Sequence, residues 1–93
     1  MFEGKKILIT GGTGSLGRSL TKKLLQSSVK TIRIFSRDEW KQVQMRSELP
    51  DKRLRFLIGD IRDKERINRA MEDIDIVFHT AALKQVPIAE YNP

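Results

Sequence analysis

The sequence contains no cysteine, and its 93 residues include a single histidine, His79. The absence of cysteine excludes a disulfide scaffold and a cysteine-based zinc site, and one histidine is too few for most histidine metal sites, so we expect no metal. No apolar run is long enough to span a membrane, and the amino-terminal residues lack the apolar core of a secretory signal. We therefore expect a cytoplasmic protein.

Acidic residues are fewer than basic ones, twelve against eighteen, which gives a net charge of +6. The excess lies in residues 1–62, with fourteen Lys and Arg against six Asp and Glu, whereas residues 63–93 hold four against six. A basic chain raises nucleic acid as a partner, but aromatic residues make up only 6% of it and no RNA-binding aromatic strand is present. Nucleic acid is therefore a disfavoured partner, and solvated helix faces or a phosphate-bearing ligand account better for the charge.

Short apolar runs alternate with amphipathic segments along the chain. The expected strands cover residues 6–10, 31–35, 54–58 and 74–79, and the expected helices cover 15–26, 38–49 and the segment after Asp63. This alternation predicts βαβ units with right-handed crossovers and a parallel sheet. We predict an α/β, Rossmann-like doubly wound sheet with strand order 3-2-1-4, in one half-domain over residues 1–93.

A glycine-rich loop follows the first expected strand and opens the first helix. Its spacing is Gly11-x-x-Gly14-x-x-Gly17. A pyrophosphate requires backbone N–H donors without an obstructing side chain, and a helix N-terminus adds partial positive charge. Gly17 has another task, since it lets the helix pack closely on the strand. The pattern predicts dinucleotide binding; a turn that serves packing alone is the alternative, and the lysine of a P-loop NTPase is missing.

The end of the second strand indicates which dinucleotide is bound. An acidic residue there would bind a ribose 2′-hydroxyl, whereas this chain has Ser36 and Arg37, followed by Lys41 one helical turn later. Because arginine is a natural phosphate ligand, the segment favours NADP over NAD. In the alternative interpretation, Arg37 belongs to a solvated loop and Asp38 caps the second helix. Asp38 could also reach a ribose.

The third strand is followed by Asp60 and Ile61. Asp60 can accept a hydrogen bond from an adenine amino group while Ile61 packs on the ring, but a turn-forming aspartate is an equally good interpretation. Trp40 is expected in the core or in a contact on a helix face.

The fourth strand ends at His79, which we expect to satisfy backbone groups there rather than to do chemistry. After it come Thr80, Ala81, Ala82 and Lys84, whose small residues let the backbone pass close to a ribose. Lys84 can reach a phosphate or a substrate, and a plain surface lysine is the alternative.

Five motifs together give a family resemblance. They are residues 7–15 (ILITGGTGS), 36–39 (SRDE), 59–63 (GDIRD), 81–84 (AALK) and 86–93 (VPIAEYNP). With them the chain resembles the amino-terminal part of extended short-chain dehydrogenases/reductases, and within these the UDP-N-acetylglucosamine 4,6-dehydratases and related proteins of capsule and flagellin sugar biosynthesis.

The resemblance implies a set of NADP-binding positions and a chemistry. The positions that it and the loop pattern assign to the cofactor are Gly11, Thr13, Gly14, Ser15, Leu16, Gly17, Ser36, Arg37, Asp38, Lys41, Asp60, Ile61, Thr80, Ala81, Ala82 and Lys84. Lys84 is also similar to the lysine that lies near the sugar nucleotide. The family removes water between C4 and C6 of a UDP-sugar, and the cofactor takes a hydride from C4 and returns it to C6.

The family's catalytic Tyr-x-x-x-Lys pair has no match. The only tyrosine is Tyr91, and a lysine four residues later would fall at position 95, outside the sequence. We therefore expect an amino-terminal fragment or a truncated reading frame that binds NADP and is inactive alone. A stand-alone nucleotide-binding or regulatory module is the alternative function. We also expect a homodimer through the exposed edge of the fourth strand, since residues 76–78 lack charge, proline and a bulge; a folded-back tail from Leu83 to Pro93 is the alternative.

Overall fold

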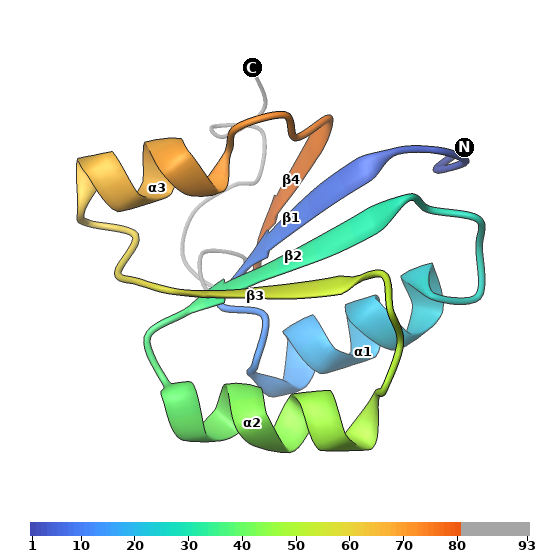
Figure 1. Cartoon of the computed structure of the whole chain (residues 1–93), viewed down its shortest axis with the longest axis horizontal. Helices are drawn as coiled ribbons and strands as arrows, with labels where there is room; N and C mark the ends of the chain where they lie inside the picture. Colours follow the sequence, from blue (N-terminus) through green and yellow to red (C-terminus); the bar gives the residue numbers. More distant parts are fainter. Residues whose placement is uncertain (81–93) are drawn as a thin grey trace.

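The computed structural model describes residues 1–80 as a single parallel sheet with helices on both faces (Figure 1). The strand order is β3-β2-β1-β4, as predicted. The elements follow the chain as β1 Lys6–Thr10, α1 Ser15–Leu24, β2 Thr31–Ser36, α2 Glu39–Glu48, β3 Leu54–Ile58, α3 Lys64–Ala70 and β4 Ile76–His79. The predicted α/β fold with a Rossmann-like sheet is therefore confirmed.

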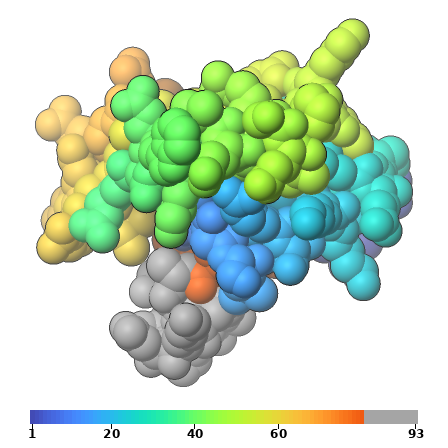
Figure 2. Space-filling model, turned by 90° about the horizontal axis from the view of Figure 1, so that it is seen from below, coloured from blue at the N-terminus to red at the C-terminus, as the bar shows by residue number. Residues whose placement is uncertain are grey.

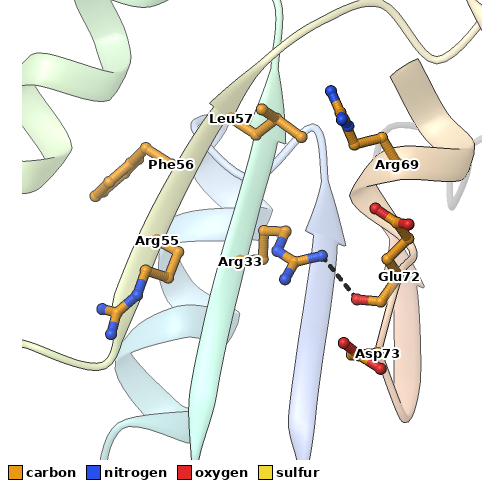
Figure 3. Close-up of a pocket in the computed structure, with 7 residues that line it drawn as sticks. All are labelled: Arg33, Arg55, Phe56, Leu57, Arg69, Glu72 and Asp73. Atoms are coloured by element: carbon orange, nitrogen blue, oxygen red, sulfur yellow. Dashed lines mark hydrogen bonds between the residues drawn. The ribbon is translucent and has the colours of Figure 1, made fainter. Parts of the chain in front are cut away.

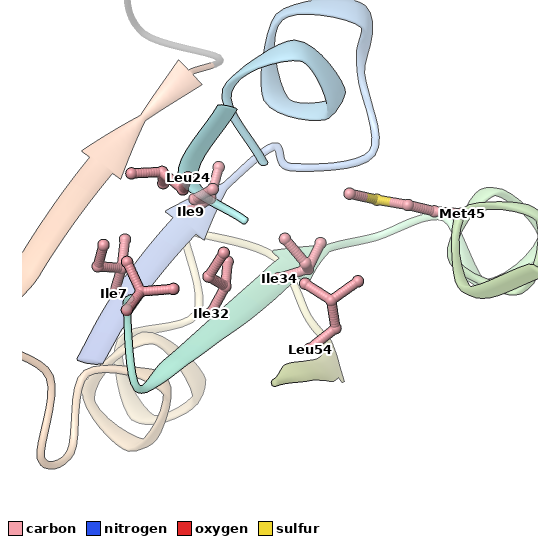
Figure 4. Close-up of a cluster of buried hydrophobic side chains, with 8 residues drawn as sticks. Ile7, Ile9, Leu24, Ile32, Ile34, Met45 and Leu54 are labelled. Atoms are coloured by element: carbon pink, nitrogen blue, oxygen red, sulfur yellow. The ribbon is translucent and has the colours of Figure 1, made fainter. Parts of the chain in front are cut away.

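Two helices cover one face of the sheet, and the third covers the other (Figure 1). On the first face, Leu24 of α1 and Met45 of α2 pack on Ile7, Ile9 and other strand residues (Figure 4). Side chains alternate along each strand, so the intervening residues form a second cluster with α3. Leu8, Phe35 and Ala70 are its fully buried members. Because both faces are covered, the central strands are nearly continuous in apolar residues.

The α1 and α2 surfaces lie side by side (Figure 2, blue and green). Arg18 of α1 joins the two helices, because its guanidinium forms an ion pair with Glu48 and also lies 3.5 Å from the backbone oxygen of Lys41. No helix in residues 1–80 is long and apolar enough to cross a membrane.

The interpretation of Trp40 as a core or helix-face residue is wrong with respect to the core, since 67% of the residue is exposed. Val43 is also exposed, and the buried positions of α2 are Gln42 and Met45. The reason lies in the helix period, because positions 42, 45 and 49 share one face, while position 40 lies almost opposite to that face and position 43 lies well away from it. On α1, Leu16 is 46% exposed, so the expected stripe with Leu24 does not extend to the first turn.

Candidate functional site

The carboxyl ends of all four strands lie at one edge of the sheet, because the strands are parallel. Thr10 is opposite both Phe35 and His79, and Ser36 is opposite Ile58. In open α/β sheets, ligands bind outside this edge where the strand order reverses. Here the reversal falls between β1 and β4, and the glycine loop, Ser36 and the segment after β3 are all brought to the same edge.

The glycine loop turns sharply at Gly11, which has a φ of +68°, a value that L side chains rarely adopt. Its N–H donates to the backbone oxygen of Phe35 at 2.8 Å, and the N–H of Gly14 donates to the oxygen of Gly11 at 3.1 Å. Gly14 is the N-cap of α1, and no side chain caps the helix there. The first N–H groups of α1 therefore face the edge of the sheet without a side-chain acceptor, which is the arrangement that binds a phosphate.

Gly17 brings α1 against the loop. A Cβ atom at this position would lie 2.5 Å from both the Cα and the oxygen of Gly12. Gly12 is confined in turn, since a Cβ there would lie 2.8 Å from Cγ2 of Ile34. The two glycines thus permit a backbone-to-backbone contact. The sequence predicted close packing of the helix on the strand, whereas the close contact of Gly17 is with the loop that follows β1.

The loop is also fixed by side chains from other elements. Arg18 Nε donates to the backbone oxygen of Thr13 at 3.0 Å. The Thr80 hydroxyl lies 2.8 Å from the oxygen of Thr10 and 2.9 Å from that of Gly11, and donates to these carbonyls. These bonds give Thr80 a structural role beside the cofactor contact that the resemblance implies, and that contact stays a prediction.

His79 lies beside the same loop. Its Nδ1 is 2.7 Å from the Thr10 hydroxyl, in a buried side-chain contact between β4 and β1. Burial disfavours the charged ring and so lowers the pKa of His79. We expected His79 to satisfy backbone groups at the strand end; the contact found here is with a side-chain hydroxyl, and the expectation about backbone groups stays a prediction.

In the segment after β2, Asp38 is hydrogen-bonded within the fold, whereas Arg37 is mostly exposed to solvent. Asp38 Oδ1 accepts from the backbone N–H of Lys41 at 3.0 Å and caps α2, which is the alternative role that the sequence allowed. The side chain of Arg37 is 72% exposed, and its Nη1 lies 3.6 Å from Asp60 Oδ2. The guanidinium is therefore held at the carboxyl edge by one screened ion pair, from which a phosphate could draw it.

Asp60 is engaged mainly by Arg62. Its Oδ1 accepts from the Arg62 backbone N–H at 2.9 Å, and its Oδ2 lies 2.8 Å from the Arg62 guanidinium. These bonds, with a smaller contribution from the charge of Arg37, hold the pKa of Asp60 well below its usual range. The turn-forming role of Asp60 is thus present, while Ile61, at 44% exposed, leaves an apolar surface beside it.

One buried polar residue near the site was missed from the sequence. Gln42 of α2 is 4% exposed, and its Nε2 lies 3.0 Å from both Ser36 Oγ and the backbone oxygen of Leu57. The available signal was its place on the apolar face of α2, one turn before Met45. Among the predicted positions, Ala81, Ala82 and Lys84 lie outside the described residues, as does the folded-back tail from Leu83 to Pro93.

A separate hollow of about 380 Å³ lies next to the carboxyl end of α3 (Figure 3). It is lined by Arg33, Arg55, Phe56, Leu57, Arg69, Glu72 and Asp73. Arg33 Nη1 donates to the backbone oxygens of Ala70 at 2.6 Å and Glu72 at 3.1 Å, so this arginine stabilises the end of α3. Arg33 of β2 and Arg55 of β3 lie opposite each other in the sheet, at positions before the carboxyl ends of the two strands. The hollow is thus separate from the glycine loop.

Comparisons with known proteins agree on the identity of this fold. A family model described as polysaccharide biosynthesis protein matches residues 7–93. The UDP-N-acetylglucosamine 4,6-dehydratase (inverting) of Campylobacter jejuni is 56% identical over 94 residues, which cover 100% of this chain and 28% of that protein. The UDP-glucose 4-epimerase of Rickettsia bellii is 50% identical over 97 residues, with coverage of 100% and 28%.

A solved structure also matches the whole chain. The X-ray structure of Pen from Bacillus thuringiensis superposes with a TM-score of 0.85 at 48% identity, over 100% of this chain and 29% of that one. The chain thus spans little more than a quarter of the length of these relatives. The family match begins in β1 and takes in every loop at the carboxyl edge of the sheet, and the chain accordingly belongs to the family of polysaccharide biosynthesis proteins.

Proposed function

We propose that the chain is the NADP-binding portion of a UDP-sugar 4,6-dehydratase-like enzyme of polysaccharide biosynthesis. The observation that carries the proposal is the first turn of α1, where the N–H groups after Gly14 have no side-chain cap and lie beside a loop in which Gly11 has a positive φ and Gly12 and Gly17 leave no room for a Cβ. This cradle suits the pyrophosphate of a dinucleotide. When bound, such a cofactor supplies hydride transfer.

The end of β2 supports NADP as the dinucleotide. Ser36 occupies the place where an acidic residue would bind a ribose 2′-hydroxyl, and Arg37 beside it presents a mostly exposed guanidinium. Asp60 is already paired with Arg62, so its negative charge is compensated near the place of the 2′-phosphate. The arrangement favours a phosphate at this position and gives no comparable advantage to a free hydroxyl.

The dehydratase-like reaction is proposed over epimerisation on the strength of the higher identity to the Campylobacter enzyme, 56% against 50% for the Rickettsia epimerase. Both names specify a UDP-sugar. The 93 residues hold no Tyr-x-x-x-Lys motif, so we expect the chain to bind cofactor without turning over a UDP-sugar. Mass spectrometry of a mixture with NADP and a UDP-sugar tests this, and a keto-sugar above the level of a protein-free sample would contradict it.

Titration with NADPH and NADH tests the cofactor assignment. One charge-assisted bond to the 2′-phosphate contributes about 1.5–3 kcal/mol, so NADPH should bind roughly ten- to a hundredfold more tightly. Arg37→Ala should remove most of this preference. Lys30→Ala is the matched control, because it removes one positive charge from an exposed residue just before β2, at the opposite edge of the sheet. Equal affinities of the unmodified chain for the two cofactors would contradict the assignment.

We also propose a homodimer that pairs the free edges of β4. In the sheet of residues 1–80, β4 pairs only with β1, and its centre is apolar at Ile76, Val77 and Phe78. Pairing about a two-fold axis would satisfy the open backbone groups. Sedimentation equilibrium across a range of concentrations tests this, and a monomer at high concentration with slow amide exchange in β4 would contradict it.

A further inference from the structure

The Gln42 side chain joins the end of β2 to the end of β3 from inside the fold. Its Nε2 lies 3.0 Å from the backbone oxygen of Leu57 and 3.0 Å from Ser36 Oγ. A backbone carbonyl can only accept hydrogen bonds, so the contact with Leu57 identifies this end of the amide as the nitrogen. The second hydrogen of the same nitrogen is therefore donated to Ser36.

This hydrogen bond determines whether the Ser36 hydroxyl can donate to a further partner. Because Oγ accepts from Gln42, the hydroxyl hydrogen has to find an acceptor elsewhere. The backbone oxygen of Ser36 is already used, since it accepts from the N–H of Gly59 at 2.9 Å. Within the described part of the chain, no hydrogen bond donated by the Ser36 hydroxyl is found. Ser36, the last residue of β2, is 8% exposed, and its hydroxyl hydrogen is left for an acceptor at the carboxyl edge, next to Arg37.

We propose that Gln42 is a positioning residue that sets cofactor specificity, by holding the Ser36 hydroxyl as a donor for the 2′-phosphate of NADP; the inference rests on the proposed function. A phosphate dianion offers only acceptor oxygens and gains fully from a fixed donor. A ribose 2′-hydroxyl both donates and accepts, so it gains less from that polarity. Gln42 acts through Ser36 and does not itself contact the ligand.

If residue 42 served only to pack α2 on the sheet, an apolar side chain would be sufficient. Met45, one turn further along the same helix face, is 0% exposed, and an apolar residue at position 42 would continue that face. Burial of an amide is unfavourable unless its hydrogen bonds are made. The amide nitrogen uses both of its hydrogens on the ends of β2 and β3, which fixes the position of Ser36 as well as the direction of its hydroxyl.

The test is a double-mutant cycle on the 93-residue chain, with adenosine 2′,5′-bisphosphate and adenosine 5′-monophosphate, two ligands that differ only in the 2′-phosphate. Calorimetry gives the ratio of their dissociation constants for the unmodified chain, Gln42→Met, Ser36→Ala and the double variant. We expect Gln42→Met to lower the preference for the bisphosphate about three- to tenfold, and to add nothing in the Ser36→Ala background. Gln44→Leu, an exposed position on the same helix, should leave the ratio unchanged.

A measurement on the unmodified chain keeps the inference testable if Gln42→Met does not fold. The side-chain amide signals of Gln42 in a ¹⁵N NMR spectrum should shift with the bisphosphate and stay in place with the monophosphate, because a phosphate that accepts from Ser36 strengthens the bond from Gln42. A shift of the Arg37 backbone signal without one at Gln42 would overturn the inference.

The outcomes separate the two proposals. Failure of the unmodified chain to bind either ligand overturns nucleotide binding and the role of Gln42 together. Equal binding of the two ligands overturns the preference for NADP. A clear preference that Gln42→Met lowers by the same factor with and without the Ser36 hydroxyl overturns only the role of Gln42, since the effect would then be independent of the hydroxyl.

Discussion

Replacement of Gly17 by alanine tests the close contact between α1 and the glycine loop. The added Cβ would lie 2.5 Å from the Cα and the oxygen of Gly12, whereas carbon atoms in contact are about 3.5–4.0 Å apart. Gly12 cannot easily retreat, because Ile34 lies behind it. The helix therefore has to move away from the loop by roughly 1 Å, and the shift disturbs the packing of Leu24 on the sheet.

The expected size of the effect follows from two opposing terms. Overpacking in a well-packed region costs about 1–3 kcal/mol and occasionally more, and a clash with backbone atoms belongs at the upper end. Replacement of glycine by alanine within a helix raises the helix propensity and so stabilises the fold by about 1 kcal/mol. We therefore expect Gly17→Ala to lower the free energy of unfolding by about 2–3 kcal/mol, and the melting temperature by roughly 8–24 °C for a domain of this size.

Thermal unfolding followed by far-ultraviolet circular dichroism measures this change. Ser19→Ala is the matched control, because Ser19 is exposed on the same helix and the substitution raises helix propensity without a clash. Its melting temperature should equal or slightly exceed that of the unmodified chain. If Gly17→Ala melted at the same temperature as Ser19→Ala or above it, the contact between α1 and the loop would not be the constraint that the geometry indicates.

Three further predictions concern other parts of the fold. Arg53→Ala should lower the free energy of unfolding by about 1.5–3 kcal/mol in urea titrations, because its guanidinium donates to the backbone oxygens of Leu25 and Ser27 and pairs with Asp51; the exposed Lys52→Ala should change it by less than about 0.5 kcal/mol. Asp60 has a depressed pKa in the fold, so its contribution to stability is present above the unfolded pKa of about 3.9 and is lost as the pH falls through the lower folded value. An NMR titration midpoint for Asp60 at or above about 3.9 would contradict this assignment. Thr80→Val should lower the free energy of unfolding by about 1 kcal/mol, since the carbonyls of Thr10 at the end of β1 and of Gly11 in the loop lose a shared donor; an unchanged urea midpoint would show that the hydroxyl does not stabilise this junction.

The sequence specified the fold well because its periodicities are clear. Apolar runs of four to six residues alternate with helical segments, and only one class of sheet fits that order. The helix ends were less accurate, since α1 ends at Leu24 rather than at residue 26 and α2 begins after its cap, Asp38. Helix ends depend on local hydrogen bonds such as the one from Lys41 to Asp38, and these do not alter the hydrophobic pattern.

The sequence predicted which residues meet at the candidate site, but not all of the hydrogen bonds between them. The residues at the ends of parallel strands had to meet at one edge, so Ser36, Arg37 and Asp60 could be grouped from the sequence. The contact of Gln42 with Ser36 could not, because hydrophobic spacing treats a buried glutamine as a gap in the apolar face. The prediction of Trp40 in the core failed for the converse reason, since its size favoured burial although its angular position on α2 lies nearly opposite the buried residues.

The amino edge of the sheet is joined by hydrogen bonds that no proposed ligand position shares. Arg53 connects the loop before β3 to the end of α1, Asp75 accepts from the N–H of Lys6 at 2.8 Å, and the backbone N–H of Lys30 donates to the backbone oxygen of Lys5 at 2.8 Å. These bonds lie at the end of the strands opposite to the proposed cofactor positions. Substitutions within residues 36–41 would therefore leave the hydrogen bonds at the amino edge in place, so effects on ligand binding could be measured separately from the loss of these bonds.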